Sequence, residues 1–211
     1  MTRLLMAICA MTLLALGSGM TTLVGTAQAQ EATEVDISTV PDMVLGDENA
    51  PVTMIEYSSY TCPHCRNYHE GPFKQIKADY IDTGKVKYIM REAYFDRYGL
   101  WASMIARCEP EKFFGISDLV FKGQSEWLRA GGPAEVIAEL RKIGRLAGIS
   151  DEKLESCLTD AQQAQTLVAW YQHHIEQDGY TGTPSFFIDG EQVDNQPYEG
   201  FKAILDEKLA Q

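Results

Sequence analysis

Basic residues are scarce in this chain. Lysine and arginine together number 18 against 30 aspartates and glutamates, which gives the 211 residues a formal net charge of −12. Nucleic-acid binding depends on basic side chains that neutralise phosphates, so this charge argues against nucleic acid as a partner. The sequence also shows no internal repeat and no low-complexity block. Its 45% hydrophobic content is enough for the core of one soluble, globular domain, with or without a sizeable insertion.

Cysteine is scarce as well, with five in the sequence and a single C-x-x-C pair, Cys62 and Cys65. The lack of a second pair at short spacing argues against a zinc site. A c-type haem site needs histidine directly after the second cysteine, and Arg66 stands there instead. A purely structural disulfide is a further alternative, although a disulfide that closes so short a loop stabilises a fold only weakly. The leading interpretation is a reversible, redox-active disulfide.

The two residues between these cysteines, Pro63 and His64, indicate which way the pair reacts. Proline is favoured as the first residue of a helix, so Cys62 is expected at the N-cap, beside unpaired backbone N–H groups. The helix dipole and a protonated His64 would then lower the pKa of the Cys62 thiol. Cys65 lies one helical turn further on, within bonding reach. Because a stable thiolate stabilises the reduced form, the pair should be an oxidant that donates its disulfide.

The first 29 residues carry a single charged side chain, Arg3. An apolar run from Leu4 to Leu16 and the small-x-small sequence at 27–29 predict a secretory signal peptide. The alternative is an uncleaved membrane anchor, because the uncharged stretch is long enough to span a bilayer. Cleavage would remove Arg3 and Cys9, which changes the net charge from −12 to −13 and the cysteine count from five to four. An even number of cysteines in an exported chain permits two disulfides.

The residues before the C-x-x-C pair predict a buried strand. Residues 52–57 are rich in β-branched and aromatic side chains, as is typical of a central strand covered on both faces. Glu56 interrupts this apolar run. A carboxylate in a buried strand is costly without a partner, and Glu56 precedes Cys62 closely, so it could pass protons to Cys65. The alternative is that Glu56 points into solvent near the end of the strand.

After the pair, the pattern predicts a helix, a second strand and a parallel sheet. We expect the helix to kink at Gly71-Pro72 and to stop at Gly84. Residues 85–90 predict the next strand, which completes a strand–helix–strand unit with parallel strands. The redox turn would therefore lie at the carboxyl end of the sheet, where the active sites of open α/β sheets lie.

Residues 98–178 predict helices alone, which favours an inserted helical subdomain. Cys108 and Cys157 both fall on apolar helix faces, so they could meet as a structural disulfide. Closure of so long a loop would stabilise the fold by roughly 4 kcal/mol in the chain-entropy model. The alternative is two buried free thiols. His69, His173 and His174 have no spacing that fits a metal site, so we expect surface or interface roles for them and no bound metal.

The chain therefore divides into segments of different character. They are a signal peptide at 1–29, a flexible leader at 30–41, a sheet domain in two parts at 42–97 and 179–211, and the helical insertion at 98–178. A short edge strand is expected near residues 42–45. In the last segment, Asp189-Gly190 between two strand-like runs predicts a hairpin, and an amphipathic helix follows it.

This order of features resembles the DsbA family of thioredoxin-like proteins over residues 42–211, and C-P-H-C is that family's characteristic active-site sequence. The resemblance implies an α/β, thioredoxin-like fold with an inserted all-helical subdomain. By position, Cys62 resembles the family's exposed nucleophile, Cys65 its buried partner and Glu56 its buried acid.

The Thr-Pro pair near the end of the chain is part of the same resemblance. Pro184 matches the cis-proline that lies opposite the active site, and the backbone of Thr183 is where such folds pair with substrate peptide. Cys108 and Cys157 depart from the simplest pattern of the family and are similar to members that carry a second disulfide.

The resemblance implies a periplasmic protein-disulfide oxidoreductase that donates disulfides to newly exported proteins through a mixed disulfide on Cys62. No cofactor beyond the redox-active disulfide is expected. The expected partners are unfolded exported proteins with cysteine thiols and a DsbB-like membrane reoxidant, with the protein itself a monomer. A periplasmic reductase or isomerase is the alternative, although residues 30–50 are too short for the dimerisation domain of isomerases. A peptide-binding chaperone is a further alternative from another functional class.

Overall fold

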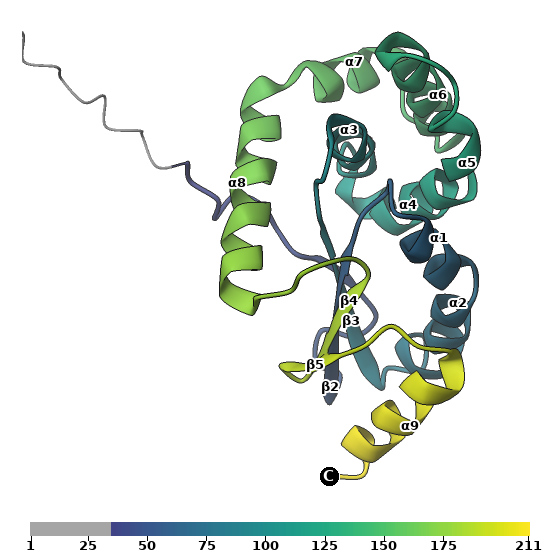
Figure 1. Cartoon of the computed structure of the whole chain (residues 1–211), viewed down its shortest axis with the longest axis vertical. Coiled ribbons are helices and arrows are strands. Elements are labelled where there is room, and N and C mark those ends of the chain that lie inside the picture. Colours follow the sequence, from purple (N-terminus) through teal and green to yellow (C-terminus); the bar gives the residue numbers. More distant parts are fainter. Residues whose placement is uncertain (1–34) are drawn as a thin grey trace, which may run out of the picture. The chain divides into compact units, whose positions relative to one another are not determined.

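The computed structural model describes residues 35–211, whose helices and strands are shown in Figure 1. The predicted signal peptide and the first residues of the predicted leader lie outside the described residues. A five-stranded sheet runs through the described part in the order β1-β3-β2-β4-β5. Its strands are β1 (Met43–Leu45), β2 (Val52–Ser58), β3 (Val86–Glu92), β4 (Ser185–Ile188) and β5 (Glu191–Val193). No helix within residues 35–211 is long and apolar enough to cross a membrane.

The middle of the sheet is formed by β2 and β3, which pair in parallel with Val52 opposite Val86. The side chains of Met54 and Tyr88 on these strands are completely buried. This confirms the predicted central strand and its parallel partner. The other neighbouring strands pair antiparallel, with β1 at one edge and the hairpin of β4 and β5 at the other. The expected edge strand and the Asp-Gly hairpin are therefore confirmed as well.

The connection between β2 and β3 is helical and broken at one place. Helix α1 (Pro63–Glu70) ends before Gly71, and α2 (Pro72–Ile76) starts at the proline that cannot continue α1. A π-helical turn, η1 (Lys77–Ile81), leads into β3. The kink at Gly71-Pro72 is confirmed, while the helix ends at Ile81, before the predicted stop at Gly84. The last helix, α9 (Tyr198–Leu209), packs against α2.

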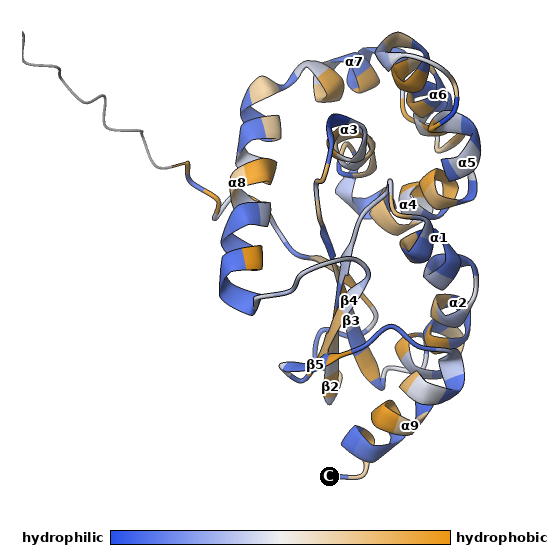
Figure 2. Cartoon of the chain, in the orientation of Figure 1, coloured by the Kyte–Doolittle hydropathy of each residue, from blue (hydrophilic) through white to orange (hydrophobic). Residues whose placement is uncertain are grey.

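Between β3 and β4 the chain forms helices, as predicted. They are α3 (Arg97–Ala106), the 3-10 turn η2 (Pro110–Lys112), α4 (Phe113–Lys122), α5 (Gln124–Trp127), α6 (Pro133–Leu146), α7 (Asp151–Thr159) and α8 (Ala161–Asp178). Helix α4 packs against α1, which joins the insertion to the redox helix. In Figure 2 hydrophobic residues are concentrated on the central strands β2 and β3, whereas β5 is largely hydrophilic and α8 carries only scattered hydrophobic residues.

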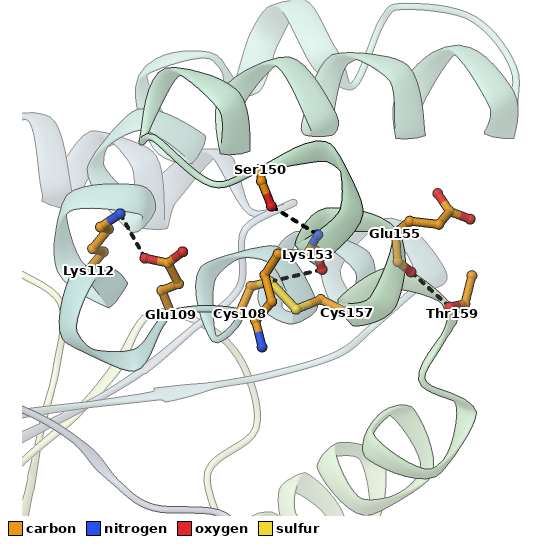
Figure 3. The surroundings of a disulfide bond; sticks show 8 residues. All are labelled: Cys108, Glu109, Lys112, Ser150, Lys153, Glu155, Cys157 and Thr159. Carbon is orange, nitrogen blue, oxygen red and sulfur yellow. Dashed lines mark hydrogen bonds and ion pairs between the residues drawn. A yellow bond between two sulfur atoms is a disulfide. The ribbon is translucent and has the colours of Figure 1, made fainter.

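A disulfide between Cys108 and Cys157 joins the turn after α3 to α7 (Figure 3). Their Cα atoms lie 5.7 Å apart although 49 positions separate them in the sequence. The side chain of Cys108 is only 7% exposed, although it lies in the turn after α3 and not on the helix face that the sequence predicts. The structure therefore contains the second disulfide and not two buried free thiols.

Candidate active site

The C-P-H-C sequence forms the turn from β2 into α1 and the first turn of that helix. Cys62 is the N-cap residue with an extended backbone, and Pro63 is the first helical residue. The N–H group of Arg66 donates to the Cys62 carbonyl oxygen at 3.2 Å, the first hydrogen bond of the helix. The predicted N-cap position of Cys62 is confirmed, so its sulfur lies at the positive end of the helix.

Cys62 is half-exposed and is an unusually acidic thiol. Its pKa is lowered to about 5, chiefly because the Cys65 thiol donates to its sulfur, with support from the backbone N–H groups of Cys65 and His64. Partial burial opposes this shift but does not cancel it. The His64 side chain is exposed, and its predicted effect on the thiolate stays a prediction.

Cys65 has the opposite character. Its side chain is completely buried, and the backbone N–H group of Ser59 donates to its sulfur at 3.4 Å. Burial raises the pKa of Cys65 far above its ordinary value, and the hydrogen bond to Cys62 and the charge of Glu56 raise it further. Near neutral pH the site therefore holds one exposed thiolate beside one buried thiol, which is the division between nucleophile and partner that the sequence predicts.

A second segment, distant in the sequence, also contacts the Cys62 sulfur. Thr183 and Pro184 lie between α8 and β4, and a cis peptide bond joins them, as the resemblance implies. The carbonyl oxygen of Thr183 lies 3.3 Å from Cys62 Sγ, and the thiol form of Cys62 donates to it. The backbone of this loop is therefore next to the reacting sulfur.

Glu56 lies under the site, completely buried on β2. The hydroxyl of Tyr88 donates to Oε2 of Glu56, and Nε2 of His69 lies 3.0 Å from the same oxygen. The alternative in which Glu56 points into solvent is therefore wrong. The expected surface or interface role of His69 is also wrong, because its side chain is 5% exposed and its ring stacks on Phe121. His69 follows Cys65 by one helical turn and so shares its inward face, which is the sequence signal for its burial.

Two further residues support the turn from outside it. Gln124 in α5 is buried, and its Nε2 donates to the carbonyl oxygens of Tyr60 at 2.8 Å and of Cys62 at 2.9 Å. Asp96 caps α3 through bonds to backbone N–H groups and also accepts a hydrogen bond from the Thr61 hydroxyl at 2.9 Å. An aspartate before a helix is a visible capping signal, whereas no local pattern connects Gln124 to residues about sixty positions away.

The remaining histidines lie away from this turn. His173 is exposed, and His174 is half-buried with Nδ1 3.2 Å from Arg91 Nη1. Burial lowers the pKa of His174 to about 4, and the charge of Arg91 lowers it as well. Within residues 35–211, no three histidine, cysteine, aspartate or glutamate side chains gather in a way that could hold a metal ion.

Comparison with known proteins identifies the family of this chain. The family model described as thioredoxin matches residues 38–207. A Rickettsia bellii protein assigned as a protein-disulfide oxidoreductase is 35% identical over 170 residues, which are 80% of this chain and 64% of that protein. Disulfide bond formation protein D of Bacillus subtilis is 25% identical over 194 residues, which cover 87% of this chain and 84% of the relative. The chain thus spans a little under two thirds of the Rickettsia relative.

Among solved structures, alpha-DsbA1 of Wolbachia pipientis superimposes with a TM-score of 0.74 at 29% identity, covering 81% of this chain and 92% of that one. The match includes a thioredoxin-like sheet with a helical insertion, as the sequence predicts. Together with the C-P-H-C helix start and the cis-proline loop, these similarities show that the chain belongs to the thioredoxin family, among its DsbA-like members.

Proposed function

We propose that this protein is a thiol:disulfide oxidoreductase that donates the Cys62–Cys65 disulfide to newly exported proteins in the periplasm. The observation that carries the proposal is the difference between the two thiols. The pKa of Cys62 is lowered to about 5, while burial raises the pKa of Cys65. A site that stabilises the Cys62 thiolate favours its own reduced form, and a protein that favours its reduced form oxidises other thiols.

The reaction begins with the oxidised form. A substrate thiolate attacks Cys62 Sγ, the bond to Cys65 breaks, and Cys65 leaves as a thiolate that takes up a proton. A second substrate cysteine then attacks its own sulfur in the mixed disulfide and expels Cys62 as a thiolate. The substrate loses two electrons and gains a disulfide, and the protein is left with two reduced cysteines. Expulsion of Cys62 is fast because its low pKa makes it a good leaving group.

Two other features support these steps. The backbone of Thr183 lies beside Cys62 Sγ, where it can pair with the extended backbone of a substrate peptide. The charge of Glu56 raises the pKa of the Cys65 thiol. Glu56 is therefore the group that would supply and remove the proton of this buried thiol. Return to the oxidised form requires a two-electron oxidant, for which the resemblance implies a DsbB-like membrane protein. The protein would act as a monomer.

The test is to equilibrate residues 30–211 with glutathione redox buffers and to measure the fraction of Cys62–Cys65 disulfide by alkylation and mass analysis. We expect a potential well above the about −270 mV typical of thioredoxin, together with rapid oxidation of a reduced, unfolded protein. A potential as low as that of thioredoxin would favour a reductase or isomerase. The Cys62→Ser/Cys65→Ser variant distinguishes an oxidoreductase from a peptide-binding chaperone. Undiminished function of that variant in cells would contradict redox chemistry.

A further inference from the structure

The buried carboxyl under the active site has an unusual neighbour in His69. The imidazole Nε2 lies 3.0 Å from one oxygen of Glu56 and 3.2 Å from the other. The side chain of Glu56 is 0% exposed and that of His69 is 5% exposed, so the histidine is the member of the pair that keeps a small contact with solvent. Phe121 covers one face of the imidazole, at 4.2 Å between ring centroids.

The other polar neighbours of Glu56 are poor proton carriers. Tyr88 donates its hydroxyl to Glu56, and Tyr68 lies close enough to be influenced by the carboxylate charge. Burial raises the pKa of both phenols well above the ordinary value, so both keep their protons during turnover. A neutral imidazole nitrogen, in contrast, can donate to a carboxylate or accept from a carboxylic acid, depending on its tautomer.

We propose that His69 is a positioning residue that holds Glu56 and carries its proton between the buried site and solvent whenever Cys65 gains or loses a proton. This inference rests on the proposed function and deepens it, because it concerns the Cys65 half of the redox cycle. The chemistry of Cys62 does not need it, since Cys62 is half-exposed and exchanges protons with water directly.

The step that depends on His69 is closure of the active-site disulfide from a mixed disulfide between Cys62 and a thiol compound. The Cys65 thiol gives its proton to the Glu56 carboxylate, and its sulfur attacks Cys62 Sγ. The new disulfide forms, the bond to the outside sulfur breaks, and that sulfur leaves as a thiolate that is protonated by water. The carboxylic acid of Glu56 then passes its proton to Nε2 of His69, and the imidazole releases a proton to solvent. In disulfide donation the same transfers run in reverse.

The test separates the two halves of the cycle. Glutathione is attached to Cys62 at acid pH with a pyridyl-activated derivative, the sample is jumped to pH 7, and glutathione release is followed by rapid quench. The attachment rate reports on Cys62, and the release rate reports on loss of the Cys65 proton. Two variants are compared with the wild type. His69→Gln keeps a hydrogen-bond donor for Glu56, and His69→Phe keeps a ring against Phe121, so the two perturb packing differently.

We expect glutathione release to slow by about 10²-fold in whichever of these variants folds, as judged by circular dichroism, while attachment changes less than twofold. The matched control is His174→Gln, which removes a half-buried histidine on α8 and should change neither rate. In a Glu56→Gln background, His69→Gln should have no further effect on release, because His69 acts through Glu56.

Three results obtained with folded variants would overturn the inference. They are unchanged release in the folded variants, equal slowing of attachment and release, or additive effects of the Glu56 and His69 substitutions. The first result would leave the proposed function intact, because the potential and substrate oxidation of the wild type decide that question separately. If neither His69→Gln nor His69→Phe folds, that result would also count against a relay, since it would show that the pair of Glu56 and His69 serves packing.

Discussion

The two cysteine pairs of this chain differ in separation and in chemistry, although each has one buried and one half-buried member. Cys62 and Cys65 are three positions apart at the start of a helix, and the first of them is half-exposed. Cys108 and Cys157 are 49 positions apart, and Cys108 is buried beside α7. The structure has the first pair as free thiols and the second pair as a disulfide. The pair at the start of the helix is therefore free to react, whereas the distant pair is already joined.

Loop length explains why the first pair can open and close without loss of the fold. Closing a loop of a few residues removes little conformational entropy from the unfolded chain. Closing a loop of about fifty residues removes more, and the folded state is stabilised by about 4 kcal/mol in the chain-entropy model. The free energy of reducing the Cys62–Cys65 disulfide is therefore set mainly by the stability of the Cys62 thiolate. The stabilisation by the Cys108–Cys157 disulfide is set mainly by the entropy of the unfolded chain. The first pair suits exchange with substrates and the second suits stabilisation of the insertion.

The largest expected effect is that of Cys62→Ala on disulfide donation. Removal of this sulfur removes the atom that every mixed disulfide requires, so oxidation of a reduced, unfolded protein should fall to the uncatalysed rate. The measurement is the rate of substrate thiol loss at equal concentrations of variant and wild type. Cys108→Ala/Cys157→Ala serves as the control and should retain at least half of the wild-type rate. Comparable loss in the control would contradict the division between a reacting pair and a structural pair.

The second prediction concerns stability. Cys108→Ala/Cys157→Ala should lower the free energy of unfolding by about 4 kcal/mol, less any strain in the native disulfide, because the unfolded chain regains the freedom of the open loop. Urea unfolding followed by circular dichroism measures this change. Reduction of Cys62 and Cys65 in the wild type is the matched comparison. A loss below about 1 kcal/mol in the double variant would show that the second disulfide does not staple the insertion.

Much of this contrast could be predicted from the sequence, because its signals are local. Proline after Cys62 marks a helix start, and the helical period places Cys108 and Cys157 on inward faces. The surface or interface role predicted for His69 is wrong because its partner Glu56 lies on β2, thirteen positions earlier, and only folding brings the two side chains together. Gln124 was not predicted at all, since its two bonds form only when the insertion folds back onto the redox turn.

The third prediction is a pH dependence that only the reduced form shows. The pKa of Cys62 is lowered to about 5 in the folded protein, against about 8.5 for an unperturbed cysteine in the unfolded chain. Its thiolate therefore stabilises the folded, reduced protein fully above about pH 8.5, and this contribution is lost as the pH falls through 5. Cys65, with its raised pKa, works in the opposite direction above about pH 8.5, because the unfolded chain ionises it first.

The measurement is the melting temperature of the reduced protein minus that of the oxidised protein between pH 4 and pH 9. We expect this difference to rise from pH 4, to reach its largest value near pH 8, and to decline beyond it. His64→Ala tests the part of the effect that the imidazole supplies, and a smaller rise in that variant would support the predicted role of His64. A difference that is constant between pH 4 and pH 8 would show that the Cys62 thiolate is not stabilised by the fold.

The smallest expected effect is that of Gln124→Met, which keeps the length of the side chain but removes both donors to the redox turn. A buried carbonyl oxygen, of Tyr60, and a partly buried one, of Cys62, would each lose a hydrogen bond, although the Cys62 carbonyl keeps its bond to the Arg66 N–H group. The free energy of unfolding should therefore fall by about 1–2 kcal/mol. Gln124 belongs to the helical insertion, which also holds Cys108 and Cys157. The loss of unfolding free energy therefore measures how strongly the insertion holds the turn that carries Cys62 and Cys65. The absorbance of the Cys62 thiolate, titrated in the same variant, shows whether the turn shifts as well. An unchanged titration with lowered stability would mean that the insertion anchors the turn without tuning its chemistry.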